Sequence, residues 1–156
     1  MALVRIIPTV KEGNMRQQDL RDQLRLPEKR FKQLWDAVSS ISTSKAIAES
    51  VAKILVKAPQ LEEFVLGACR FVTYSFKGSM MKEVILHRGR ATQDVKLYLI
   101  VVSDQLLTQR ERVLEWHLAK QIACACLHIF EGGKSQRKLR SEADELAASW
   151  GFTPAG

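Results

Sequence analysis

The chain has 156 residues and a mass of 17.7 kDa, a size that is typical of a single domain. Its residues are 46% hydrophobic and 26% charged, and this balance excludes a chain that is mainly disordered or of low complexity. The formal net charge of +7 suits contact with nucleic acid or with an acidic protein. Residues 1–57 carry most of the excess, since they hold 11 basic and 6 acidic residues.

The sequence has no feature of a membrane or secreted protein. No run of about 18 or more apolar residues occurs, so we expect no helix that spans a membrane. Residues 1–7 lack the long apolar stretch and the cleavage site of a secretory signal. The three cysteines, Cys69, Cys124 and Cys126, are too few and odd in number for a disulfide framework. We therefore expect a cytoplasmic protein.

The first third of the chain predicts mainly helices. Residues 3–7 are typical of a short strand, and residues 11–25 of a loop or a marginal helix. A helix is predicted to begin near residue 26, because apolar residues follow at helical spacing: Phe31, Leu34, Trp35 and Val38. After a break of small hydroxyl residues at 39–44, a second helix is predicted over 46–57.

The rest of the chain predicts a small sheet followed by two helices. The expected elements, in chain order, are a short helix at 61–69, strands at 71–76, 82–87 and 95–102, a long helix at 108–130, a basic loop at 134–140 and a last helix at 141–150. This order predicts one α+β domain over residues 1–156, with a small sheet that is mostly antiparallel or mixed. Residues 1–57 form its basic, mainly helical portion and residues 58–152 its core.

The long helix carries an unusual polar row. His117, Gln121, Cys124 and His128 follow one another at spacings of four, three and four, and so share one side of the helix. Cys124 and His128 have the spacing of paired ligands on adjacent turns, and zinc is the metal that they suit. His117 lies roughly 10 Å from Cys124 along the axis, which is too far for both to bind the same ion without a large deviation from helix geometry. With Glu142 as a further ligand, these residues define one hypothesis, a metal-dependent hydrolase with a non-standard site.

A second hypothesis comes from a resemblance. Residues 99–107, residues 118–124 (Leu-Ala-Lys-Gln-Ile-Ala-Cys) and residues 141–152 resemble the core of zincin-type metallopeptidases, in particular the small ones found in phages and their hosts. Members of that superfamily run from an edge strand into a helix with a motif such as Leu-Ala-His-Glu-Ile-Ala-His. The resemblance implies a zincin-like fold for residues 58–152, with Glu142 or Asp144 in the segment that often supplies the third zinc ligand.

The sequence departs from that motif at each position that carries the chemistry. Lys120 and Cys124 stand where the resemblance expects the two histidines, and Gln121 stands in place of the catalytic glutamate. A register that begins at His117 keeps the first histidine, but it puts Leu118 in place of the catalytic glutamate and Gln121 in place of the second histidine. We therefore assign no catalytic residue and expect no metal. The resemblance implies a pseudo-peptidase that acts by binding another macromolecule, most simply a protein.

A third hypothesis is a nucleic-acid-binding module that uses the basic first third of the chain. Residues 31–38 and 44–57 are compatible with a helix-turn-helix pair. The basic residues that we single out for contact with nucleic acid or a partner are Lys29, Arg30, Lys45, Lys53, Arg137, Lys138 and Arg140.

Overall fold

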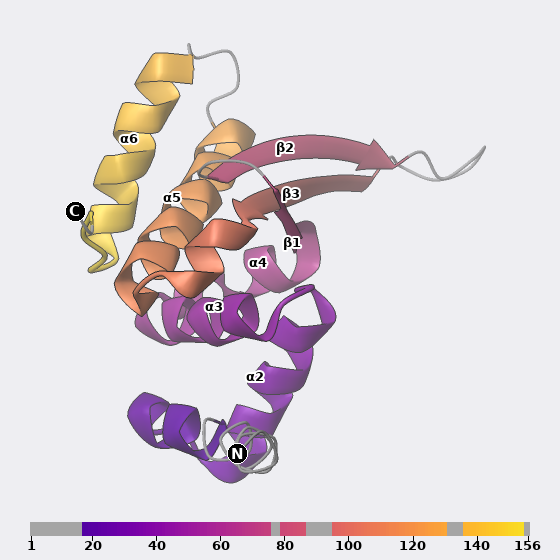
Figure 1. The fold of residues 1–156 in the computed structure, drawn as a ribbon. Coiled ribbons are helices and arrows are strands. Elements are labelled where there is room, and N and C mark those ends of the chain that lie inside the picture. The colour runs from indigo at the N-terminus through magenta and orange to yellow at the C-terminus, as the bar shows by residue number, and fades with distance from the viewer. Residues whose placement is uncertain (1–16, 76–78, 87–94, 131–135, 155–156) are drawn as a thin grey trace, which may run out of the picture.

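The structure is a computed structural model that describes residues 17–75, 79–86, 95–130 and 136–154. It has the predicted α+β architecture, in which a small sheet is combined with several helices (Figure 1). A helix at residues 17–24 is followed by α2 (Glu28–Ser40), α3 (Lys45–Lys57), a short 3-10 helix η1 (Pro59–Leu61) and α4 (Glu62–Ala68). The later elements are β1 (Cys69–Tyr74), β2 (Ser79–Leu86), β3 (Val95–Ser103), a 3-10 helix η2 (Asp104–Thr108), α5 (Glu111–Phe130) and α6 (Gln136–Ser149). The strand that we predict at residues 3–7 lies outside the described residues.

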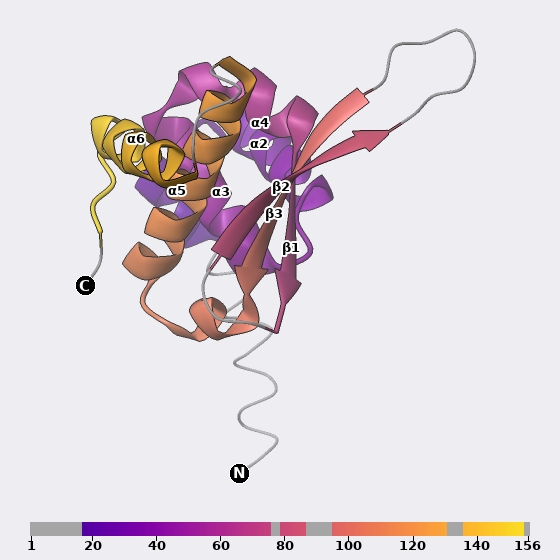
Figure 2. The same cartoon turned by 90° about the horizontal axis from the view of Figure 1, so that it is seen from above.

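The sheet is mixed, with one parallel and one antiparallel pair of strands. Its strand order is β1-β3-β2, so β3 lies between two strands that are consecutive in the chain. β3 runs parallel to β1 and antiparallel to β2, and Ile100 is the register partner of both Phe71 and Met81. The outer edge of β1 is bound by the segment before α3, where Thr43 N–H donates to Phe71 O (3.1 Å) and Phe71 N–H donates to Ile41 O (2.8 Å). β2 therefore forms the other edge of the sheet. The end of β2 and the start of β3 lie side by side and extend past the helices (Figure 2).

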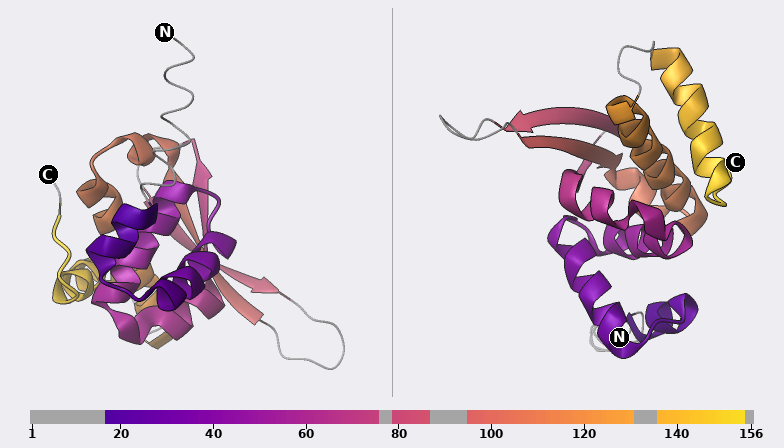
Figure 3. Two further views of the ribbon diagram at one scale, coloured as in Figure 1. Left: turned by 90° about the horizontal axis from the view of Figure 1, so that it is seen from below. Right: turned by 180° about the vertical axis from the view of Figure 1, so that it is seen from behind.

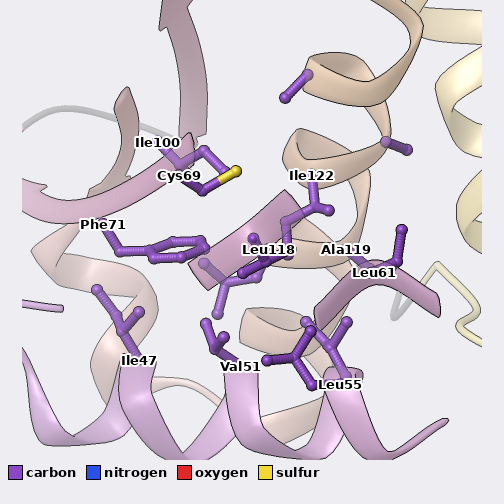
Figure 4. Packing of buried hydrophobic residues seen from close by; sticks show 14 of the residues in the cluster. Ile47, Val51, Leu55, Leu61, Cys69, Phe71, Ile100, Leu118, Ala119 and Ile122 are labelled. Atoms are coloured by element: carbon purple, nitrogen blue, oxygen red, sulfur yellow. The ribbon is translucent and has the colours of Figure 1, made fainter. Parts of the chain in front are cut away.

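The core lies between α3, α5 and one face of the sheet. Val51 of α3, Leu118 and Ile122 of α5, and Phe71 and Ile100 of the sheet are fully buried against one another (Figure 4). The same cluster runs from Leu34 on α2 to Phe152 after α6, so it joins both predicted portions of the chain. In the part of the chain that the structure describes, no helix combines the length and the apolar character needed to cross a lipid bilayer.

The last helix begins earlier than predicted. α6 starts at Gln136, so the expected basic loop at 134–140 is wrong for residues 136–140, which are helical. The reason is the apolar stripe of α6, because half-buried Leu139 stands four residues before Ala143, which in turn stands four before Ala147. Figure 3 shows α6 alongside α5, on the side away from the sheet. Arg137, Lys138 and Arg140 are therefore exposed on the first turns of a helix.

Candidate functional site

The candidate site lies along the middle of α5, where this helix passes between β2 and α6. α5 contacts β2 on one side and packs along α6 on the other. This placement separates the predicted motif residues. Gln121 faces the start of β2, whereas Lys120 and Cys124 face α6.

Gln121 connects α5 to the edge strand. Its side chain is 7% exposed, and its Nε2 donates to both Oγ and the backbone oxygen of Ser79, at 3.0 and 3.3 Å. Ser79 Oγ also shares a hydrogen bond of 2.9 Å with His117 Nδ1. Burial, together with the nearby Lys120 ammonium, lowers the pKa of His117, so its imidazole is neutral at pH 7. The three polar groups therefore fix the first residue of β2 to the helix.

Lys120 and Asp144 form an ion pair between α5 and α6. Lys120 Nζ lies 3.9 Å from Asp144 Oδ1, an oxygen that is buried and accepts no hydrogen bond. Cys124 is buried beside this pair. Burial is the main reason that the pKa of the Cys124 thiol is raised; Asp144 adds to this effect, while Lys120 and Arg140 oppose it. The thiol is thus held in its protonated form at neutral pH, and this form is a poor nucleophile.

The structure does not bring the predicted hydrolase ligands together. His117 is bound to Ser79, and Cys124 faces α6. The His128 ring stands edge-on to the Tyr98 ring, with centroids 6.0 Å apart and an interplanar angle of 69°. Glu142 lies half-buried on α6. Within the described ranges, no three His, Cys, Asp or Glu side chains approach closely enough to share a metal ion.

The positions that the zincin resemblance singles out do meet in space, but their chemistry does not fit zinc. Lys120, Cys124 and Asp144 come from two helices and lie together. A zinc ion needs deprotonated sulfur, imidazole or carboxylate ligands, and an ammonium group at the same place repels it.

The predicted basic residues do not form one surface. Arg30 Nη2 donates to both carboxylate oxygens of Glu62, at 2.6 and 2.5 Å. Lys53 Nζ lies 2.9 Å from Glu111 and 3.5 Å from Glu115. The remaining predicted residues are exposed: Lys29, Lys45, Arg137, Lys138 and Arg140. They divide between α2 and α3 on one side and α6 on the other, far apart in Figure 1. Lys53 of the helix-turn-helix hypothesis is therefore already paired with two carboxylates of this chain and is not available to bind phosphate.

Comparison with known proteins adds no relative. The chain matches no protein-family model, no curated protein and no solved structure. The zincin resemblance therefore rests on the motif residues of the sequence alone.

One residue of the site has no signal in the sequence. Ser79 follows a turn-like Lys-Gly pair and stands 38 and 42 residues before its two partners on α5. Only the position of β2 at the edge of the sheet brings it there, and no local spacing indicates that contact.

Proposed function

We propose that this protein is a non-catalytic binding protein with a zincin-like arrangement, in which an internal ion pair takes the place of a metal ion. The observation that supports this most strongly is the 3.9 Å contact between Lys120 and Asp144, with Cys124 beside it. The resemblance places the two histidine ligands at Lys120 and Cys124, and it puts Asp144, like Glu142, in the segment that often supplies the third ligand. A lysine ammonium is a compact positive charge that can balance the Asp144 carboxylate without a metal.

The neighbouring residue supports the absence of peptidase chemistry. A peptidase of this type needs a carboxylate that accepts a proton from the attacking water. Gln121 occupies that position, and its amide donates to Ser79 instead. An amide side chain has no proton-accepting group of suitable basicity, so the residues at this place favour a structural role.

A protein with a zincin-like fold but without the catalytic residues acts by binding through its surface. A protein partner suits this chain best. The net charge of +7 favours an acidic partner. The three cysteines are free, which supports a reducing compartment such as the cytoplasm.

The proposal is tested by restoring the metal ligands. In the double variant Lys120→His, Cys124→His, two imidazoles stand at i and i+4 and face Asp144, so we expect it to bind about one zinc per chain. Adding Asp144→Asn should weaken zinc binding at least about tenfold. Elemental mass spectrometry on protein purified without chelator or histidine tag measures the metal, and circular dichroism checks the fold.

The control is Lys29→His, Gln33→His, which creates the same spacing on the exposed side of α2, with no third ligand designed into it. It should bind zinc no more tightly than the variant that carries Asp144→Asn. A folded Lys120→His, Cys124→His variant that takes up no zinc contradicts the zincin-like arrangement. A wild-type protein that holds about one zinc, and loses it in Cys124→Ala or His128→Ala, supports the metal-dependent hydrolase instead.

A further inference from the structure

β3 is apolar on both of its faces, although the helices cover only one. Tyr98, Ile100 and Val102 point into the core and are at most 1% exposed. The alternate residues Leu97, Leu99 and Val101 point away from it and are half-buried. A strand with one face in water normally alternates apolar and polar residues, and a continuous apolar run is typical of a strand covered on both sides.

The neighbouring strands extend this second face. Val101 pairs with Val72 on β1 and with Met80 on β2, so the three residues form one row across the sheet. Tyr74 lies at the end of β1, beside Ser103. Tyr74 is 69% and Met80 41% exposed, and these are the exposed large hydrophobic residues in the described ranges. We refer to the set as the open sheet face: Val72, Tyr74, Met80, Leu97, Leu99 and Val101.

No helix of the described chain covers the open sheet face. α4 and α5 are the helices with the principal contacts to the strands, and both lie on the core side. Phe64 of α4 packs on the Tyr98 ring with centroids 5.9 Å apart, and Leu118 of α5 packs near Phe71 and Ile100 (Figure 4). None of the six residues belongs to the core cluster or to the residues packed against it. In Figures 1 and 2 the helices gather on one side of the sheet.

Leu99, at the centre of this face, has a basic register partner on each neighbouring strand. Leu99 pairs with Arg70 on β1 and with Lys82 on β2. The Arg70 guanidinium is fixed in place, because its Nη1 donates to the backbone oxygens of Leu66 (3.2 Å) and Cys69 (2.7 Å). A second copy of the chain packed on this face would bring basic residues toward basic residues. Nucleic acid is a poor match as well, because Tyr74 is the one aromatic residue among the six described residues of the open sheet face, and so the one that could stack on a base there.

We propose that the open sheet face binds an amphipathic helix of a partner protein, whose apolar stripe is flanked by acidic residues. The two outer strands are about 10 Å apart, which matches the width of one α-helix lying on the sheet. Such a helix would complete the two-sided cover that β3 lacks, and its carboxylates would face the Arg70 guanidinium. This inference rests on the proposed binding role but is independent of the zincin-like arrangement.

The test uses a displayed library of helical peptides about 18 residues long, with apolar residues varied along one stripe and acidic, basic or neutral residues varied beside it. Selection against the full-length wild-type chain should enrich peptides with acidic flanks. Leu99→Gln or Val101→Gln should weaken their binding at least about tenfold. Leu107→Gln, at a half-buried leucine on η2 outside the open sheet face, should leave it within about twofold. Circular dichroism confirms the fold of each variant, and amide shifts on peptide addition should fall on β1, β3 and β2.

Three outcomes overturn the inference. The first is a set of enriched peptides without acidic bias, or with binding that Leu99→Gln leaves unchanged. The second is a wild-type dimer in solution that Leu99→Gln dissociates, which assigns the face to a second copy. The third is binding of a DNA or RNA oligonucleotide that Leu99→Gln abolishes. None of these results alters zinc uptake by the variant Lys120→His, Cys124→His, so failure of the docking surface is separable from failure of the proposed zincin-like arrangement.

Discussion

Lys120 Nζ of α5 lies 3.9 Å from Asp144 Oδ1 of α6. This carboxylate oxygen is buried and accepts no hydrogen bond. The two positions are 24 residues apart, and the zincin resemblance places a histidine ligand at the first and puts the second in the segment that often supplies the third ligand. Both side chains are partly exposed, so the pair itself contributes little to stability, on the order of 0–1 kcal/mol. What matters for function is that the Lys120 ammonium group lies beside the protonated thiol of Cys124.

The amide of Gln121 should matter more for stability than for any reaction. In Gln121→Met the side-chain volume is kept, but the hydrogen bonds to the hydroxyl and backbone oxygen of Ser79 are lost. We expect the free energy of unfolding to fall by about 1–3 kcal/mol, measured by urea denaturation. Gln33→Met, at an exposed position of α2, should change it by less than about 0.5 kcal/mol. An unchanged stability in Gln121→Met would mean that this contact does not hold β2 to α5.

His117 should make the stability depend on pH. Burial, helped by Lys120, lowers the pKa of His117 in the folded protein below its ordinary value of about 6.5. The unfolded chain therefore binds a proton more readily, and the contribution of His117 is fully present above about pH 6.5 and is lost as the pH falls. Between pH 7.5 and pH 5, the wild type should lose more unfolding free energy than His117→Gln. Equal losses in the two proteins would show that His117 titrates as it does in the unfolded chain.

The predictions that succeeded rest on strong local patterns. The spacing of Phe31, Leu34 and Val38 indicates α2, and these three residues are buried. The apolar run in residues 95–102 indicates β3, and the long helix predicted over residues 108–130 is α5 (Glu111–Phe130). The α+β class followed from the order of these elements.

The features that the sequence did not indicate are mostly relations between elements that are distant in the sequence. Strand patterns do not show which strands pair, so nothing local indicated that β3 would lie between β1 and β2. The first turns of α6 were predicted as a loop because residues 136–140 are mostly charged. Half-buried Leu139 is the one apolar residue there, which is too few to show a helical spacing. Lys53 was predicted as a cation offered to nucleic acid from its place on α3, but its two glutamate partners lie 58 and 62 residues further along the chain.

Lys53 should act as a structural residue. Its side chain is 17% exposed, and Glu115 beside it is 16% exposed. Burial acts to lower the pKa of Lys53, but the contacts with Glu111 and Glu115 outweigh it and raise the pKa. Lys53→Ala leaves Glu115 half-buried without this partner, so we expect a loss of about 1–2 kcal/mol in unfolding free energy. The exposed Lys29 is the control, and Lys29→Ala should cost less than about 0.5 kcal/mol by the same urea titration. Equal effects would place Lys53 among the solvated lysines.

Two glycines should respond to alanine in opposite directions. Gly151 ends α6 with a φ of +95°, and Phe152, which follows it, donates its N–H to Ala147 O (3.3 Å) and is 4% exposed. A Cβ at Gly151 would meet no atom within 4 Å, so the cost of Gly151→Ala comes from the backbone alone, about 1 kcal/mol. Gly67 has equally open surroundings but lies inside the helix α4. Gly67→Ala should therefore stabilise the protein by about 0.5–1 kcal/mol. Urea denaturation of both variants decides the matter, because a stabilising Gly151→Ala would contradict the left-handed turn that directs Phe152 into the core.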